Sequence, residues 1–284
     1  MKNVSKRFQA MVCFLCLISV NLFAQTKIDS TGAGLQSIAM GIQQDSIIVN
    51  RFRYDSIFTR ALIQDLKQPF SFNFRLDSLT AVQHIVAPDK AFKLFCWQLD
   101  LGDGTYRQRA AMQFPTIDGS LSLIPFFDNS DFVTNPTKGV LDRKKWIGAI
   151  YYDIIVTEYN HKKYYTLLGY DENNLTTSNK IIEVMHFENK EPILGGDFFS
   201  YPPDDTYPLA PIDRFIYTYK KGSNANIRYE PLQKQLVLSE LASTENNLKL
   251  SSTLVPSGNE IYFSWINGKW TMLPAKKAIK KPTN

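Results

Sequence analysis

The sequence predicts a mainly β protein, built from antiparallel strands as an open meander, a sandwich or a propeller-like sheet, with one N-terminal helix. Residues 145–187 form the longest run with strand-like alternation, and short strand patterns separated by Gly, Asn and Asp continue on both sides of it. Only one segment shows a clear helical period. Since no repeat of fixed length is present, a regular propeller is the weaker of the three arrangements.

The central run divides into three strands that we expect to pair as a meander. In the first strand, Trp146, Ile150 and Ile154 share one parity, and successive side chains of a strand point to opposite faces. We therefore expect one buried face and one mixed, partly solvated face. The pair Asn160-His161 and the polar cluster 171–174 have the composition of turns. The strands are predicted at residues 146–159, 164–170 and 180–187.

The N-terminus has the features of a secretory signal peptide. Three basic residues in the first seven precede an apolar stretch at 11–23, and Ala24-Gln25 follows as a cleavage site. The apolar stretch is shorter than a membrane-spanning helix requires. We predict that residues 1–24 are removed on export, to the periplasm, the outer-membrane surface or the medium, and that the mature chain has no transmembrane segment.

Charge and cysteine content exclude several classes of function. Loss of 24 residues leaves 260, and the formal charge falls from +5 to +2. Four of the remaining lysines lie in the last nine residues, so that 275–284 is predicted to be a basic, disordered tail, and nucleic-acid binding is not indicated. Cys13 and Cys16 leave with the signal peptide. Cys96 is then alone, and a buried, inert thiol is a simpler interpretation than a nucleophile.

The segment before the β region is predicted to contain a linker and a helix. Residues 25–45 are polar and glycine-bearing, as in a linker or flexible arm, and 46–85 form a helical N-terminal element. The apolar period predicts a helix over 55–67, which Asp55 or the serine after it can cap. Beyond it, residues 70–76 alternate as in a strand.

Residues 86–274 are predicted to form one antiparallel β domain. Asp-Gly and Asn-Gly pairs mark its hairpin turns. Outside the central meander, the predicted strands are 92–99, 105–114, 120–124, 214–220, 227–229, 235–238, 260–265 and 270–273.

The segment APDKAFKLFCW at 87–97 resembles an uncharacterised family of exported, β-rich proteins of Bacteroidota, which often show a Ser-Pro-Asp turn before a strand ending in Trp. Here Ala87 replaces that serine. The resemblance continues through 163–187, 226–241 and 265–270 and covers most of residues 87–273. It implies an exported β-rich protein and adds no catalytic residue.

Asp-Ser-apolar and Asp-Ser-Thr tripeptides resemble the motif that the same bacteria O-glycosylate on exported proteins. They nominate Ser30, Ser46 and Ser78 as glycosylation sites. The alternative is that Asp-Ser pairs simply open helices and turns. We prefer that alternative for Asp55-Ser56.

Recognised catalytic and cofactor motifs are absent from the sequence. The three histidines lack the spacing of metal ligands on a helix, and neither a nucleophile elbow nor a phosphate loop is present. No cofactor or metal is predicted. Asp100 and Asp103 are either a carboxylate pair, part of a calcium site, or residues of an Asp-Gly turn, and the turn is the simpler interpretation.

Aromatic residues give the best candidates for binding, since the chain has 14 Tyr, 19 Phe and 4 Trp. Several fall in predicted loops, and long loops on a rigid sheet often carry recognition. The simpler alternative is that these loops cover a sheet edge. The candidate binding residues are Phe126, Phe127, Tyr201, Asp204, Asp205 and Tyr207.

These observations predict an exported, non-catalytic binding or structural protein of the cell envelope, with a glycan or a protein as partner. The alternative is a hydrolase that acts on an envelope polymer or glycan through paired carboxylates. A deep cleft with paired acids of raised pKa would favour the hydrolase, and a flat aromatic platform would favour binding.

Overall fold

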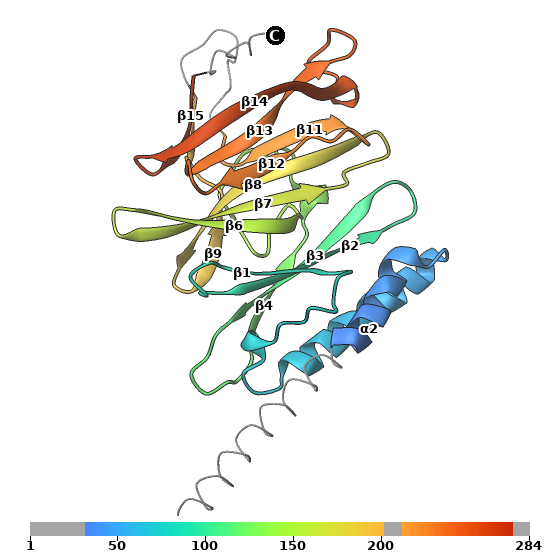
Figure 1. Cartoon of the computed structure of the whole chain (residues 1–284). Helices are drawn as coiled ribbons and strands as arrows, with labels where there is room; N and C mark the ends of the chain where they lie inside the picture. Colours follow the sequence, from blue (N-terminus) through green and yellow to red (C-terminus); the bar gives the residue numbers. More distant parts are fainter. Residues whose placement is uncertain (1–31, 202–211, 275–284) are drawn as a thin grey trace, which may run out of the picture. The chain divides into compact units, whose positions relative to one another are not determined.

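The computed structural model describes residues 32–201 and 212–274 (Figure 1). The chain divides into two compact units. The first takes the chain up to Val82 together with Pro115–Ser122, and the second takes Gln83–Phe114 and the chain from Leu123 onward.

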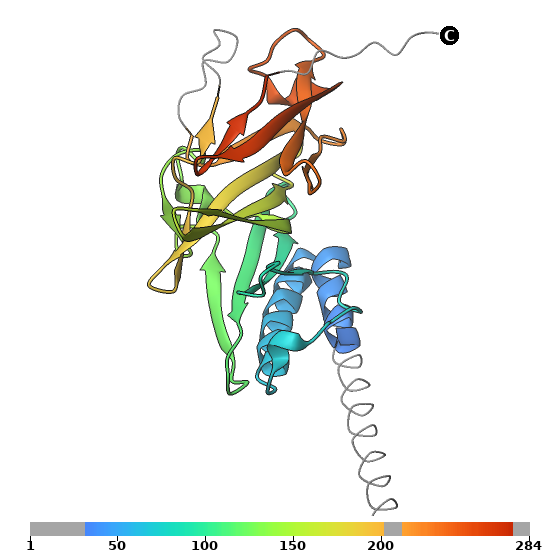
Figure 2. The same cartoon turned by 60° about the vertical axis from the view of Figure 1, so that its left-hand side comes forward.

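The first unit contains two helices that lie side by side (Figure 2). Residues 32–44 are helical, where a linker or flexible arm was expected, and α2 (Ile48–Leu66) follows after a short turn. Three glycines lower the helix propensity of 32–44 and hide its amphipathic period in the sequence. That period is nevertheless present, because Leu35, Ala39 and Ile42 are all buried.

The α2 helix begins seven residues before the predicted start. Asp55 is therefore a buried residue inside the helix rather than its cap. At the true start, the Asp45 carboxylate accepts a hydrogen bond from the N–H of Ile47 at 2.8 Å. The first turn exposes Ile48 and Val49 to solvent, so an amphipathic pattern does not reveal it.

The strand predicted over residues 70–76 is wrong. A 3-10 turn, η1 (Ser71–Asn73), occupies this place, and Phe70 before it has a φ of 60°. The Ser71 hydroxyl donates a hydrogen bond to the Leu66 carbonyl at 2.5 Å and so closes the end of α2. Local side-chain bonds of this kind compete with a strand.

The second unit holds three sheets, and the prediction of a mainly β, antiparallel fold is confirmed. The first sheet has the order β1 (Gln83–Val86), β2 (Lys93–Asp100), β3 (Tyr106–Phe114) and β4 (Ser122–Phe127). The second has the order β5 (Leu141–Asp142), β9 (Glu191–Leu194), β8 (Thr177–Glu188), β7 (Lys162–Asp171) and β6 (Ile150–Tyr159), with β11 (Phe215–Lys220) also paired to β8. The third has the order β10 (Phe199–Ser200), β15 (Lys269–Met272), β14 (Leu254–Ile266), β13 (Gln235–Ser243) and β12 (Ile227–Glu230).

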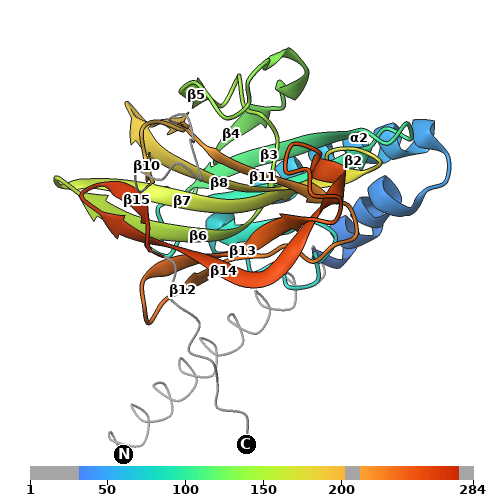
Figure 3. The same ribbon diagram turned by 90° about the horizontal axis from the view of Figure 1, so that it is seen from above.

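The predicted central meander is β6, β7 and β8. Asn160 and His161 join the first two strands with φ values of 49° and 60°, as a tight hairpin turn requires. The long strand β8 pairs with β7 on one side, while β9 and β11 pair with opposite ends of its other side (Figure 3).

The meander is the middle layer of a three-layer sandwich. One core, containing Ile154 and Leu167, lies between it and the first sheet, and another, containing Ile155 and Leu168, lies between it and the third. Both faces of the meander therefore carry core residues. Its first strand keeps the mixed face that was expected, since Asp153 and Thr157 are half-buried and Tyr159 is exposed. A β-bulge after Tyr151 breaks the simple alternation predicted for the first strand.

Candidate functional site

A pocket of about 290 Å³ lies in the second unit, on the face of the middle sheet that is turned toward the first sheet. Its wall is formed by aliphatic side chains, and polar side chains gather on the turn after β7 and on β8 and β11. The lining residues are Ser130, Val133, Pro136, Ile147, Gly148, Asp171, Asn173, Asn179, Ile181, Ile216 and Thr218.

The floor of the pocket follows directly from the pairing of β8 with β11. Ile181 lies opposite Ile216, and Asn179 lies opposite Thr218, so the two pairs form neighbouring apolar and polar patches on one face. The Thr218 hydroxyl donates a hydrogen bond to Asn179 Oδ1 at 2.7 Å, which fixes the orientation of this amide.

Asp171, the last residue of β7, carries the charge of the pocket. Its Oδ1 accepts hydrogen bonds from Gln108 Nε2 at 2.6 Å and from the N–H of Asn173 at 3.0 Å, and its Oδ2 accepts from Asn179 Nδ2 at 3.3 Å. Burial raises the pKa of the Asp171 carboxyl, and the Asp128 carboxylate adds to the rise, whereas the three donors oppose it.

A second carboxylate, that of Asp128, lies behind this site but is closed to solvent. Its side chain has 0% exposure, and its oxygens accept bonds from the N–H of Gln108 at 2.8 Å and from the hydroxyl and N–H of Ser130 at 2.7 and 3.0 Å. Gln108 thus holds one carboxylate with its backbone and the other with its side chain. The pocket itself receives a single carboxylate.

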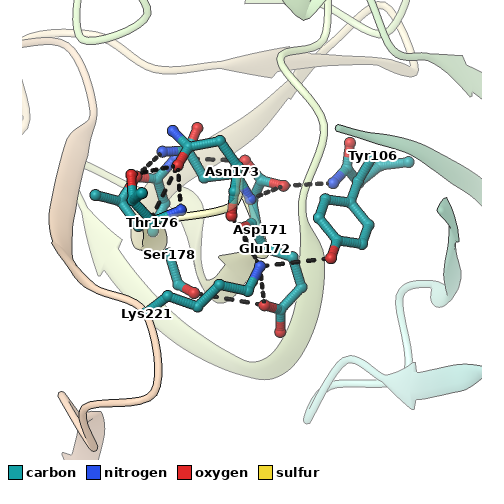
Figure 4. A network of polar contacts seen from close by, with 11 residues as sticks. Tyr106, Asp171, Glu172, Asn173, Thr176, Ser178 and Lys221 are labelled. Atoms are coloured by element: carbon teal, nitrogen blue, oxygen red, sulfur yellow. Dashed lines mark hydrogen bonds and ion pairs between the residues drawn. The ribbon is translucent and has the colours of Figure 1, made fainter. Parts of the chain in front are cut away.

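The turn that carries Asp171 and Asn173 is held by Lys221 (Figure 4). The Lys221 ammonium donates to the carbonyls of Glu172 and Asn174 at 3.0 and 2.9 Å, pairs with the Glu172 carboxylate at 3.0 Å and reaches the hydroxyl of Tyr106. Burial lowers the pKa of Lys221, but the bonds to Glu172 and Tyr106 outweigh it, and the net change is a rise.

The pocket wall at Pro136 is anchored by a buried ion pair. Arg214 donates from Nε to Glu183 Oε1 at 2.7 Å, and both side chains have 0% exposure. The remaining guanidinium nitrogens bond the carbonyls of Pro136, Lys138, Gly139 and Leu194 at 2.9 to 3.3 Å. The segment before β5 is thereby tied to β8 and β9.

The aromatic candidate binding residues that the structure describes, Phe126, Phe127 and Tyr201, do not lie together. Phe126 is a buried core residue that packs edge-on against Trp146, unlike the exposed loop residue that was expected, while Phe127 beside it is 53% exposed. The alternation of β4 separates them. Tyr201 packs against Phe263 on the other side of the middle sheet, and burial raises the pKa of its phenol.

The remaining nominated residues divide into exposed and undescribed ones. Ser46 and Ser78 are exposed in turns of the first unit. The candidate binding residues Asp204, Asp205 and Tyr207, the cleavage site Ala24-Gln25, the glycosylation candidate Ser30 and the basic tail lie outside the described residues.

The structure gives no support to the other chemistries weighed above. Cys96 is buried in β2, and burial raises the pKa of its thiol to about 12. The carboxylates of Asp100 and Asp103 accept bonds from turn N–H groups at 2.7 and 2.9 Å. Within residues 32–201 and 212–274, no three acidic, His or Cys side chains gather as ligands for a metal ion. Over the same residues, no helix is long and apolar enough to cross a bilayer.

Sequence reasoning missed the pocket because its polar residues have the composition of a turn. Residues 171–174 were interpreted as a turn, which they form, but nothing in that run shows that Asp171 is half-buried. The one available signal was the alternation of β8, which places Asn179 on the same face as Ile181 and Glu183.

Comparison with known proteins adds no family to these observations. No protein-family model matches the chain, and no curated protein and no solved structure shows significant similarity to it. The resemblance to exported proteins of Bacteroidota therefore remains a prediction.

Proposed function

We propose that this is an exported binding protein of the cell envelope that holds a small ligand in the pocket beside Asp171 without converting it. The supporting observation is that the described lining offers one carboxylate among amides, hydroxyls and aliphatic side chains. Pockets for small molecules likewise combine polar groups in fixed positions with an apolar wall. A volume of about 290 Å³ is at the lower end of such sites, so the ligand is small.

The alternative is a hydrolase, for which the raised pKa of Asp171 beside Asp128 is the specific observation. A glycosidase of the usual kind needs two carboxyl groups that both face the scissile bond. The side chain of Asp128 has no exposed surface and its oxygens are occupied by donors. This arrangement favours binding over hydrolysis.

The test is a thermal-shift screen of the purified protein against monosaccharides, amino sugars, amines, amino acids and small carboxylates. A ligand at 100 times its Kd adds about 2.7 kcal/mol of stability. For a chain of this size, that corresponds to a rise in Tm of roughly 5–10 °C.

A matched pair of variants assigns any hit to the pocket. Val133→Trp fills the pocket from its wall, whereas Val140→Trp adds the same indole to a nearby residue that is 60% exposed and outside the lining. We expect the shift to disappear with the first variant and to remain with the second. A shift that survives Val133→Trp, or a library without a hit, would refute this function. Turnover of a hit that is lost in Asp171→Asn would favour the hydrolase.

Export and glycosylation are tested together by the intact mass of the protein isolated from its native cells. Removal of residues 1–24 predicts a chain that starts at Gln25. Added hexose masses on Ser46 or Ser78 would support O-glycosylation. The bare polypeptide mass would dispose of it.

A further inference from the structure

We propose that the ligand of this pocket is a small organic cation, whose ammonium group binds Asp171 and whose carbon chain lies on the aliphatic wall. This inference rests on the proposed binding function and names its ligand class.

The charge around the pocket is negative and is not compensated within the described residues. Asp171 is the one charged side chain of the described lining, and its three hydrogen-bond donors are neutral amides. Neutral donors satisfy the oxygens of a carboxylate but leave its charge. An ammonium group that enters the pocket would supply the missing positive charge and a charge-assisted hydrogen bond.

The nearby charged groups do not reverse the sign of this charge. Arg107 forms ion pairs with both Asp128 and Asp131, at 3.9 and 2.5 Å. These three side chains together carry one net negative charge, in addition to that of Asp171. Glu172 and Lys221 form a pair at 3.0 Å and cancel. The buried pair of Arg214 and Glu183 at the wall also cancels, and the ammonium of Lys180 on β8 lies over the rings of Tyr152 and Tyr170.

The wall distinguishes an organic cation from the other ligands that this charge might attract. Ile147, Ile181 and Ile216, with Val133 and Pro136, form an apolar surface that fits a carbon chain. The oxygens of the described lining include a single carboxylate, that of Asp171, whereas Ca²⁺ sites commonly use several. The described lining contains no aromatic side chain on which a sugar ring would stack. An anionic ligand would meet the Asp171 carboxylate, and no cationic side chain is among the described lining residues.

The size of the pocket sets the probes. Pentylammonium, pentan-1-ol and pentanoate each have five carbons and carry a cationic ammonium, a neutral hydroxyl and an anionic carboxylate head group, respectively. Binding is measured by titrating each compound into the isotope-labelled full-length protein and following amide chemical shifts near β8 and β11. We expect pentylammonium to bind at least about tenfold more tightly than the other two, the ratio for one charge-assisted hydrogen bond.

Two variants, each of which removes one negative charge, test whether the preference for the amine over the alcohol comes from Asp171. Asp171→Asn removes the charge from the pocket, and we expect the ratio of amine to alcohol affinity to fall to about one while the alcohol still binds. Glu172→Gln removes the adjacent charge of the same turn, which pairs with Lys221 outside the lining, and we expect the ratio to remain. In the wild type, the amine preference should also fall as pH is lowered and Asp171 takes up a proton.

Each outcome decides the proposal. Equal binding of the three probes would overturn the charge assignment and leave the binding pocket in place. Tighter binding of pentanoate, an amine preference that persists in Asp171→Asn, or shifts produced by Ca²⁺ or Mg²⁺ alone would overturn it. The absence of binding by all three probes would overturn the organic-cation assignment, while a different hit in the thermal-shift screen would still uphold a binding protein.

Discussion

Loss of Arg214 should destabilise the second unit more than loss of any exposed arginine. The change is Arg214→Met, which keeps the apolar stem and removes the guanidinium. It leaves the Glu183 carboxylate buried without its cation and removes the donors of four carbonyl groups. Breaking a buried ion pair from one side costs about 3–5 kcal/mol. Because the freed carbonyls add to that cost, we expect about 4 kcal/mol or more.

The assay is urea unfolding followed by tryptophan fluorescence at neutral pH, with far-UV circular dichroism to confirm the fold. Trp146 is a nearby reporter, because its indole N–H bonds the hydroxyl of Tyr151, which in turn donates to Glu183. For a chain of this size, 4 kcal/mol corresponds to a fall in Tm of roughly 10 °C.

The matched control is Arg228→Met. Arg228 is paired as well, in its case with two carboxylates, those of Glu230 and Glu260, at 2.7 and 2.8 Å, but its side chain is 39% exposed. Exposed pairs contribute less than about 1 kcal/mol. A loss in Arg214→Met no greater than in the control would refute the reasoning. In addition, the double variant Arg214→Met with Glu183→Leu should lose less stability than the sum of the losses in the two single variants. It leaves no buried charge without its partner.

Three further predictions concern other parts of the fold. Thr166→Val removes the acceptor of the buried indole N–H of Trp270, at 2.8 Å, and should cost about 1–3 kcal/mol in urea unfolding; a cost below about 0.5 kcal/mol would contradict this. Gly148→Ala and Gly139→Ala both place a side chain at a positive φ. Only the Cβ at 148 meets a side-chain oxygen, Gln108 Oε1 at 2.7 Å, and Gln108 is buried with its amide bonded to Asp171, so Gly148→Ala should cost at least about 1 kcal/mol more in urea unfolding. Burial raises the pKa of Asp89, but its ion pair and hydrogen bonds outweigh this, so the folded pKa lies below 3.8. The stability that the ionised Asp89 contributes is then present above pH 4 and lost as pH falls through the folded pKa. The difference in unfolding free energy between the wild type and Asp89→Asn, under about 1 kcal/mol, should therefore close in acid. A difference that widens in acid would contradict this prediction.

The strands were predictable where alternation and turn composition agree. The hairpin at Asn160-His161 and the one at Asn267-Gly268 have residues that adopt positive φ, and both form as expected. Where the signals disagree, the prediction failed. Pro256 and Gly258 hid the first half of β14, which the structure shows as a continuous strand from Leu254.

The three-layer arrangement was indicated in the sequence but was not recognised. Leu167-Leu168 and Ile181-Ile182 place an apolar side chain on each face of the same strand. Adjacent apolar residues of this kind are typical of strands that are buried on both sides. The choice of partner for each face depends on contacts between distant segments, which one sequence does not reveal.

The pocket and the buried ion pair belong to one arrangement, because the residue directly before a strand that lines the site is also the anchor of its wall. Arg214 lies directly before β11, and its guanidinium holds the carbonyl of Pro136, while β11 itself presents Ile216 and Thr218 to the pocket. The wall at Pro136 and the floor at β11 are therefore fixed through the same side chain. Since a ligand gains affinity from a site that is already ordered, loss of Arg214 should weaken binding as well as folding. Thr166→Val, which acts in the core on the other side of the middle sheet, should lower stability alone.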